Sequence, residues 1–121
     1  MTKAPHIYLK LWLQHENKIL LGLGRVQLLK KIGELGSLKK AAESLGMSYR
    51  AAWGRIKRTE EAMGLVLLEA AGTKREGCRL SPAGREAVEA FLAWHEDVYA
   101  YALKRAEGLP FSMIREIPPA T

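Results

Sequence analysis

Apolar and polar side chains alternate along residues 7–13, which is typical of a β-strand with one buried face. Residues 14–18 are polar and indicate a turn, and the alternation resumes over residues 19–23. The pattern therefore predicts a two-stranded hairpin over residues 7–23. Because an isolated hairpin is only marginally stable in water, we expect it to pack on the rest of the domain or against a second copy of the chain.

From residue 24 onward the apolar residues recur every three or four positions, as they do on one face of an amphipathic helix. The first predicted helix starts at Gly24. Its apolar face consists of Val26, Leu29, Ile32 and Leu35. Gly36 is suited to end it, because glycine tolerates the left-handed backbone of a helix C-terminus. Residues 24–64 as a whole are predicted to form a three-helix core.

Ser37 and Ser48 each lie where a side-chain oxygen can cap the N-terminus of a following helix. The helix after Ser37 is short and ends at Gly46, whereas the helix after Ser48 continues to Gly64. Only Gly46 and Met47 separate the two helices, so they must turn sharply against each other. This arrangement is typical of a helix-turn-helix, in which the second helix enters a groove of DNA.

Residues 65–80 have the pattern of a short hairpin of the size called a wing. We expect its strands at residues 65–69 and 78–80, joined by a polar turn over residues 70–77. Together with the preceding helices, this hairpin predicts a mainly α-helical fold with a small amount of β-structure, namely a winged helix-turn-helix.

Ser81 and Pro82 predict the start of a long helix over residues 82–107, because serine is a favourable cap and proline suits the first helical position. An apolar stripe runs along this helix, which therefore needs a partner, and the same helix of a second subunit is the expected one. The candidate dimer contacts are Leu9, Leu11, Phe91, Leu92, His95, Val98, Tyr99 and Ala102. We expect one domain over residues 1–108 and a C-terminal tail over residues 109–121.

The charge of the chain is concentrated in its central part. The 121 residues contain 19 Lys and Arg against 13 Asp and Glu, a formal net charge of +6. Residues 24–86 hold 13 of the basic residues and seven of the acidic ones, so the whole excess lies over the predicted helix-turn-helix and wing. Such an asymmetry is expected where one face meets a polyanion, and the alternative is a solvated, lysine-rich surface.

The composition disfavours several classes of function. The chain has no apolar run long enough to cross a membrane and no signal-peptide pattern at its N-terminus, so we expect a cytoplasmic protein without a membrane partner. A single cysteine, Cys78, and three scattered histidines predict neither a disulfide nor a metal site. No catalytic motif, cofactor motif or small-molecule effector site is evident, so we do not expect an enzyme.

The helix predicted after Ser48 divides into an apolar face and a polar face. The apolar face consists of Ala52, Ile56, Thr59 and Met63. Arg50 lies near the helix start and is the expected reader of a base, since a guanidinium can bond guanine at two points. Lys57 and Arg58 are expected to bind phosphate, as are Ser48 and Tyr49 with the backbone N–H groups of the first turn. The alternative for Arg50 is an ordinary solvated arginine.

Further candidate DNA contacts lie beside these positions. Trp53 is on the same helix and is expected either at the edge of the core or against a thymine methyl group or a sugar. Lys39 precedes the turn, on the helix that crosses the DNA backbone in this motif. Lys74 and Arg75 lie at the wing tip, from which they could reach the minor groove or a flanking phosphate.

Residues 36–57, with the sequence GSLKKAAESLGMSYRAAWGRIK, resemble the winged helix-turn-helix of LysR-type regulators. They are more similar to the N-terminal DNA-binding domain of the ModE-type molybdate-responsive regulators, because residues 48–53, SYRAAW, include a Tyr and a Trp that LysR regulators do not usually have there. Residues 80–84, LSPAG, extend the similarity, which covers roughly residues 7–107. The resemblance implies a dimeric winged helix with groove-facing residues at Ser48, Tyr49, Arg50, Trp53 and Lys57.

In ModE-type regulators the molybdate site lies in a C-terminal pair of small β-barrel domains. The residues after Glu107 are too few for such domains, so we expect a stand-alone DNA-binding domain that does not itself bind molybdate. The leading hypothesis is a homodimeric, sequence-specific regulator of transcription that binds double-stranded DNA, with genes related to molybdate or molybdenum enzymes as candidate targets. The alternative is a protein-interaction module that partners a separate oxyanion-sensing or regulatory protein.

Overall fold

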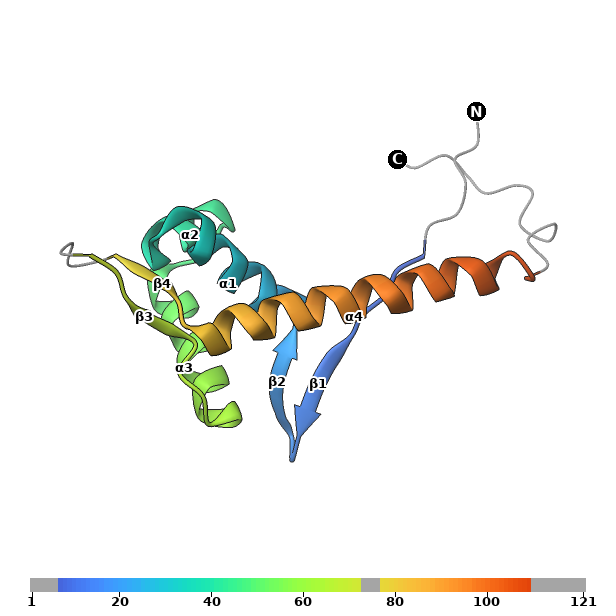
Figure 1. Cartoon of the computed structure of the whole chain (residues 1–121), viewed down its shortest axis with the longest axis horizontal. Helices are drawn as coiled ribbons and strands as arrows, with labels where there is room; N and C mark the ends of the chain where they lie inside the picture. The colour runs from blue at the N-terminus through green and yellow to red at the C-terminus, as the bar shows by residue number, and fades with distance from the viewer. Residues whose placement is uncertain (1–6, 73–76, 110–121) are drawn as a thin grey trace.

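The computed structural model describes residues 7–72 and 77–109. The elements follow in the order β1 (Trp12–His15), β2 (Lys18–Gly22), α1 (Leu23–Leu35), α2 (Leu38–Ser44), α3 (Tyr49–Met63), β3 (Leu68–Ala70), β4 (Cys78–Leu80) and α4 (Pro82–Ala106) (Figure 1). Strands β1 and β2 form one antiparallel hairpin, and β3 and β4 form a second one, the wing. The fold is mainly helical, and it is the predicted winged helix-turn-helix.

The N-terminal hairpin is shorter than predicted. Strand β1 starts only at Trp12, and most of residues 14–18, which were predicted as a turn, belong to the paired strands. The reversal takes only Glu16 and Asn17, whose φ angles of 47° and 68° suit a two-residue hairpin turn with positive φ at both positions. Strand β2 leads directly into α1, so residues 7–11 have no partner strand in the part of the chain that the structure describes, although they keep their alternating burial.

Helix α1 forms the centre of the domain and contacts α2, α3, α4, β2 and β4. Its buried residues are Val26, Leu28, Leu29 and Ile32. The predicted apolar face omitted Leu28 and wrongly included Leu35, which is exposed. Because several elements surround α1, its buried face is wider than the single stripe expected of a surface helix. Gly36 ends the helix in the left-handed conformation, as predicted.

Both predicted serine caps are present in the helix-turn-helix. The Ser37 Oγ accepts a hydrogen bond from the Lys40 N–H at 3.1 Å, and the Ser48 Oγ accepts one from the Ala51 N–H, also at 3.1 Å. Each cap satisfies a backbone donor that has no partner within the first helical turn. The starts of α2 and α3 are therefore fixed by local interactions.

Strand β3 of the wing starts three residues later than predicted, at Leu68, whereas β4 has its predicted bounds. The residues before β3 are bonded to the start of α4. The Leu67 C=O accepts a hydrogen bond from the Ser81 N–H at 2.9 Å, and the Val66 C=O accepts one from the Ser81 hydroxyl. The bond between Ser81 and Leu67 continues the register of the wing hairpin. The pair stays incomplete, because the Ser81 C=O accepts a hydrogen bond from the Arg85 N–H of α4 instead.

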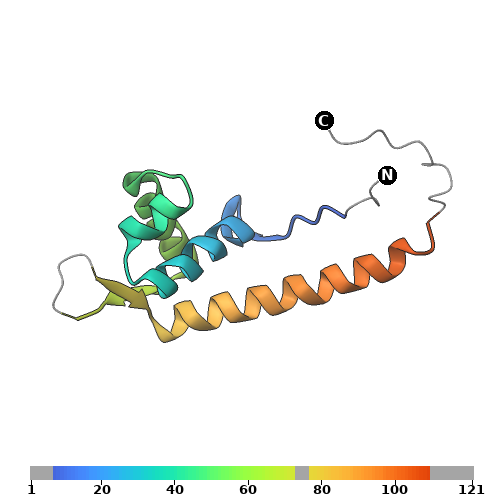
Figure 2. The same cartoon turned by 90° about the horizontal axis from the view of Figure 1, so that it is seen from above.

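Helix α4 starts after Ser81, whose Oγ accepts a hydrogen bond from the Gly84 N–H at 2.9 Å. Gly84 lies so close to the chain before β3 that a Cβ there would overlap the Leu67 carbonyl oxygen. Val88 and Phe91 are buried, and α4 contacts α1. No residue of α4 beyond Phe91 is buried, and the helix projects past the core (Figures 1 and 2).

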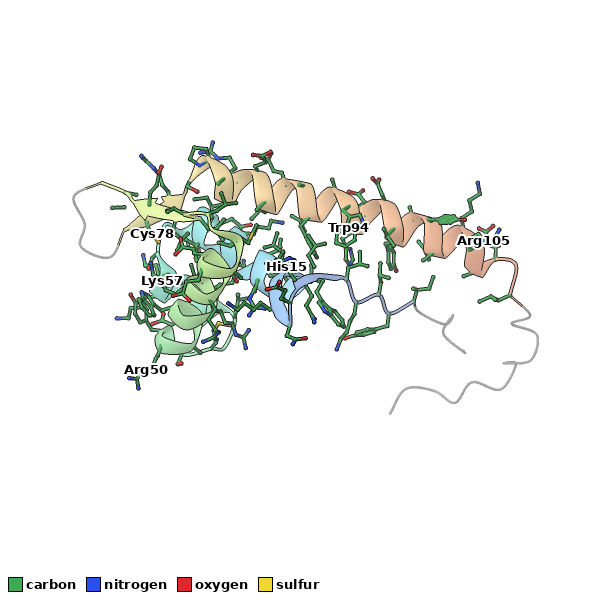
Figure 3. All side chains as sticks on the ribbon, turned by 90° about the horizontal axis from the view of Figure 1, so that it is seen from below. His15, Arg50, Lys57, Cys78, Trp94 and Arg105 are labelled. Carbon is green, nitrogen blue, oxygen red and sulfur yellow. The ribbon has the colours of Figure 1, made fainter. Side chains whose placement is uncertain are left out.

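The chain before β1 runs alongside the projecting part of α4 (Figures 2 and 3). Along these residues, Ile7, Leu9 and Leu11 are partly buried, whereas Tyr8 and Lys10 are exposed. Within residues 7–72 and 77–109, no helix is both long and apolar enough to cross a membrane.

Candidate nucleic-acid interface

Helix α3 carries the predicted DNA-contacting residues on its exposed side. Ala52, Ile56 and Thr59 are buried in the core, which directs the opposite side of the helix to solvent. The exposed predicted residues are Ser48, Tyr49, Arg50, Trp53, Lys57 and Arg58. Figure 3 shows Arg50 near the N-terminal end of α3, pointing away from the protein. The predicted division of α3 into an apolar and a polar face is confirmed.

We call Trp53, Lys57 and Glu60 the wing-side flank of α3. Trp53 and Lys57 line a hollow together with Leu68 and Cys78 of the wing, and Glu60 is hydrogen-bonded to Leu68. The Lys57 Nζ lies 5.6 Å from the centroid of the Trp53 ring and 3.3 Å from the Glu60 Oε1. Both neighbours attract an ammonium group. Trp53 is 48% exposed, so it lies on the surface with Lys57 over its ring instead of in the core.

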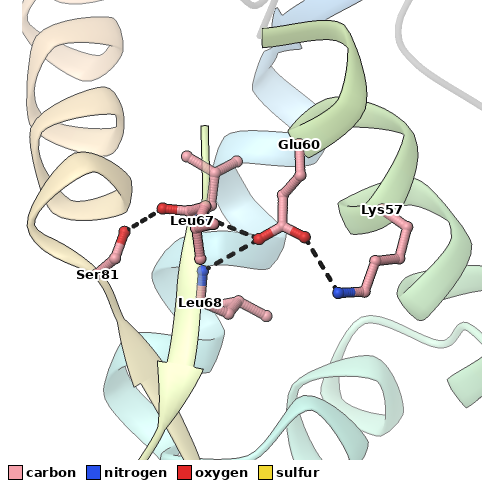
Figure 4. A network of polar contacts seen from close by, with 6 residues as sticks. Lys57, Glu60, Leu67, Leu68 and Ser81 are labelled. Carbon is pink, nitrogen blue, oxygen red and sulfur yellow. Dashed lines mark hydrogen bonds and ion pairs between the residues drawn. The ribbon is translucent and has the colours of Figure 1, made fainter. Parts of the chain in front are cut away.

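Glu60 also joins α3 to the wing (Figure 4). Its Oε2 accepts a hydrogen bond from the Leu67 N–H at 2.8 Å and a longer one from the Leu68 N–H at 3.4 Å. Its side chain is only 13% exposed, and hydrogen bonds to an ionised acceptor are stronger than those between neutral groups. Glu60 therefore fixes the position of β3 relative to α3. This role could not be predicted from the sequence, because nothing local indicates which backbone donors need an acceptor.

We call Arg25, Arg55 and Arg58 the arginine cluster. Arg25 lies in the first turn of α1, and the other two lie on the flank of α3 away from the wing. All three line one hollow, and Arg25 and Arg58 also line a second. Burial lowers the pKa of Arg25, and the positive charges of Arg58 and Arg55 lower this pKa further. Among the described residues, no carboxylate oxygen lies within 4.0 Å of these guanidiniums.

Arg58 is the one member of this cluster that was predicted from the sequence to contact DNA. Arg55 and Arg58 are three positions apart and so share a helix flank, which is a signal that the sequence does contain. Arg25 is remote in sequence and joins them only through the packing of α1 and β2 on α3. Of the other predicted DNA contacts, Lys39 is exposed on α2, and Lys74 and Arg75 lie outside the described residues.

The predicted dimer contacts fall into two groups. Phe91 is 3% exposed and belongs to the core of its own chain, against which Leu11 and Leu92 pack. The remaining predicted contacts are partly buried: Leu9, His95, Val98, Tyr99 and Ala102. The rings of Phe91, His95 and Tyr99 follow one another along α4 with centroids 6.3 and 6.4 Å apart. The stripe predicted on α4 therefore exists, but Phe91 is already covered by its own chain.

Cys78 lines the hollow of the wing-side flank and is partly buried. Burial raises the pKa of its thiol, and a hydrogen bond with the Leu38 backbone acts in the opposite direction. A neutral thiol is a poor nucleophile and a poor metal ligand. In the part of the chain that the structure describes, no three His, Cys, Asp or Glu side chains are grouped so as to hold a metal ion.

A family model described as the lysR family of bacterial regulatory helix-turn-helix proteins matches residues 23–85, just over half of the chain. The chain belongs to the LysR family of bacterial regulatory helix-turn-helix proteins. The resemblance seen in residues 36–57 is thereby confirmed, and the chain is a DNA-binding domain of the transcription-regulator type.

Solved structures of LysR-type DNA-binding domains have the same fold. The BenM DNA-binding domain in complex with benA site 1 DNA matches with a TM-score of 0.58 and 21% identity, covering 74% of this chain and 100% of that chain. The CbnR DNA-binding domain in complex with DNA matches with a TM-score of 0.56 and 22% identity, covering 69% of this chain and 95% of that one.

A curated relative is the molybdenum-pterin-binding protein MopB of Rhodobacter capsulatus. It is 36% identical over 75 residues, which make up 60% of this chain and 28% of MopB. The chain thus corresponds to less than a third of the length of this relative. The similarity agrees with the molybdate-related resemblance of residues 48–53.

Proposed function

We propose that this LysR-family chain binds double-stranded DNA sequence-specifically as a homodimer and regulates transcription, with α3 in the major groove. The observation that carries the proposal is the exposed side of α3, on which Arg50 points away from the protein while the opposite side is held in the core (Figure 3). Among the described residues, Arg50 forms no ion pair within 4.0 Å. Its donors are therefore available to the acceptors of a guanine.

The test is a binding titration with DNA selected from a random pool. Arg50→Ala is expected to weaken binding to the selected sequence about tenfold or more and to relax the preference at one base pair, since a two-point contact to guanine contributes about 1–3 kcal/mol of discrimination. Arg85→Ala, an exposed arginine on α4, is the matched control. Unchanged affinity in the double variant Arg50→Ala, Lys57→Ala would contradict the proposal.

The homodimer is proposed from the projecting part of α4. An apolar stripe without full burial along a helix favours association with a second helix. Tyr99→Glu with Ala102→Glu is expected to convert a dimer into a monomer in sedimentation experiments, because it places two charges in this stripe. Glu96→Gln, which is exposed on the same helix, should leave the dimer intact. A wild-type chain that sediments as a monomer at all concentrations would refute this part of the proposal.

The DNA sequences selected from the random pool provide an independent test of the homodimer. A two-fold symmetric subunit pair is expected to select two inverted half-sites whose centres are about one helical turn, or a multiple of it, apart. A single half-site with no symmetric counterpart would indicate that one chain binds alone.

The molybdenum-related relative motivates a narrower proposal, that the regulated genes are concerned with molybdate or molybdenum enzymes. We propose further that molybdate does not bind this chain directly. A ligand at one hundred times its dissociation constant stabilises a protein by about 2.7 kcal/mol, so added molybdate should leave the thermal unfolding of the chain unchanged at constant ionic strength. A clear rise in the melting temperature would contradict this.

A second candidate function is a protein-interaction module, and one surface favours it. An apolar hollow lies between the N-terminal hairpin and α4, lined by Leu13, Leu65 and Trp94, each of which is partly exposed. Co-purification of one defined partner that survives nuclease treatment, and that Trp94→Glu abolishes, would favour this function. Loss of all bound protein with the nuclease would favour DNA binding instead.

A further inference from the structure

We propose that the arginine cluster, Arg25, Arg55 and Arg58, is a binding site for a phosphate oxyanion, separate from Arg50 and from the wing-side flank. The phosphate has two possible sources, a phosphodiester of bound DNA and a free phosphate ion, which present the same oxygens to arginine. The inference rests on the proposed function only where the phosphate belongs to DNA.

The geometry brings the three guanidiniums to one place on the surface. They line a hollow of about 510 Å³ that lies between the chain before β1, the start of α1 and the flank of α3 away from the wing. Lys10 lines the same hollow, and Lys18 lines the adjoining one. Basic side chains from an extended segment, from β2, from α1 and from α3 thus converge, although they are far apart in the sequence.

The charge at this place is not neutralised within the described residues. No ion pair involves the three arginines, and the Glu61 side chain, which lines the adjoining hollow, is not within 4.0 Å of any of them. The Arg25 Nε is buried and has no hydrogen-bond partner. Gathering like charges around an unsatisfied donor costs free energy, and a bound anion would offset that cost.

The first turn of α1 adds donors to the same hollow. Gly22 caps this helix without a side-chain hydrogen bond, and the first turn contains no acidic residue. Gly22, Leu23 and Gly24 line the hollow together with Arg25, so the N-terminal end of the helix, which is positively polarised, faces it.

The donor type favours phosphate. A guanidinium presents a planar fork of donors that matches two oxygens of a phosphate group, and arginine stays charged at all physiological pH values. The Arg58 guanidinium lies over Gly54, because a Cβ built at Gly54 would be 3.2 Å from the Arg58 Nη1. A Cβ at position 54 would require this guanidinium to move by a few tenths of an ångström.

The first experiment titrates the purified chain with inorganic phosphate at constant ionic strength, with chloride as the balancing anion. The side-chain Nε signals of Arg25, Arg55 and Arg58 are observed by nitrogen NMR. We expect saturable shifts at these three arginines and none at Arg85, and we expect Arg58→Gln to weaken the response at Arg25 about tenfold. Arg25→Gln provides a second variant, and the backbone spectrum shows whether each variant is folded.

The second experiment measures DNA affinity as a function of salt. If a DNA phosphodiester occupies the cluster, Arg58→Gln lowers the slope of log K against log salt by about one unit, whereas Arg85→Gln leaves it unchanged. A slope change assigns the site to DNA, and a saturable phosphate response with an unchanged slope assigns it to free phosphate. If wild-type chain binds no DNA, the proposed function fails and the phosphate titration alone decides the site.

The proposal is overturned by the absence of both responses. A phosphate titration without saturation, or with equal shifts at Arg85, together with an unchanged salt slope in Arg58→Gln, would mean that the cluster is only a set of solvated arginines.

Discussion

Both flanks of α3 carry basic residues, but in different surroundings. On the wing-side flank, Lys57 is held between the Glu60 carboxylate and the Trp53 ring. On the other flank, Arg55 and Arg58 lie beside Arg25 with no carboxylate within 4.0 Å among the described residues. The charge of Lys57 is paired within the chain, with the same Glu60 that positions the wing. The charges of the arginine cluster are not paired among the described residues and are therefore available to an anion.

Basic residues on the two flanks of α3 are therefore not interchangeable. Lys57 was predicted from the sequence to bind phosphate, yet its ammonium already has two neighbours, and moving it onto DNA would cost it these contacts. The arginine cluster makes no such contact among the described residues, so an anion that binds there breaks no ion pair. We therefore expect phosphate-dependent effects to be larger on the arginine side of α3 than on the wing side.

The largest expected effect on stability comes from Gly84→Ala, because position 84 packs directly against the backbone before β3. A Cβ at this position overlaps the Leu67 carbonyl oxygen, a backbone atom that cannot rotate away. Overpacking of this kind costs about 3 kcal/mol, which should be measurable by urea denaturation. Gly108→Ala, where a Cβ has only an ordinary contact with the Arg105 carbonyl oxygen, is the control. Equal stability of the two variants would show that the chain before β3 moves freely.

Glu60→Ala is expected to have the next largest effect, because it leaves the Leu67 and Leu68 N–H groups without their acceptor. Leaving a buried donor unsatisfied costs about 1–3 kcal/mol. Hydrogen exchange at these two amides should become faster in the variant, and the free energy of unfolding should fall by about 2 kcal/mol. Glu43→Ala, exposed on α2, should change neither quantity. Unaltered exchange at both amides would remove Glu60 as the link between α3 and the wing.

Gly54→Ala tests the other flank and should act in the opposite direction on stability. Alanine is favoured over glycine inside a helix by up to about 1 kcal/mol, so the free energy of unfolding should rise. The new methyl group requires the Arg58 guanidinium to move by a few tenths of an ångström, so the response of the arginine cluster to phosphate should weaken slightly. A variant that is more stable and binds phosphate as tightly as wild type would show that Arg58 finds an equivalent position.

The smallest expected effect concerns the reactivity of Cys78 on the wing side. Burial raises the pKa of this thiol, so a smaller fraction is thiolate at neutral pH than in an exposed cysteine. Alkylation should therefore be slower in the folded chain than in the same chain in urea, and the folded rate should rise as the pH increases toward the raised pKa. Equal rates in the two states at neutral pH would contradict the burial of the thiol.

The features that sequence predicted well are those that depend on neighbouring residues. Ser37, Ser48 and Ser81 were identified as caps, and each accepts a hydrogen bond from a backbone N–H three residues later. Such a bond needs only the local backbone, so the residue type and its place before an apolar pattern suffice. The exposed residues of α3 were identified for the same reason, from the period of a helix.

The errors arose where one segment depends on another that is distant in the sequence. Residues 7–11 alternate in burial as predicted, but they form no strand. The pairing of the hairpin ends at Trp12 and Gly22, because the chain after Gly22 is already helix α1. Leu68 opens β3 later than expected, because the Leu67 N–H is bonded to Glu60 instead of to the opposite strand. Arg25 joins Arg55 and Arg58 only in the folded chain, and no periodicity in the sequence connects them.

Helix α4 is fixed to the core only through its first part, and its 25 residues span about 37 Å. A rigid rod held at one end amplifies small rotations, and a tilt of about 5° at its base moves its far end by about 3 Å over this length. If two chains meet along their projecting ends, the separation of their recognition helices is set by this angle. Substitutions near Val88 and Phe91, far from any DNA contact, would then change which half-site spacing the pair accepts.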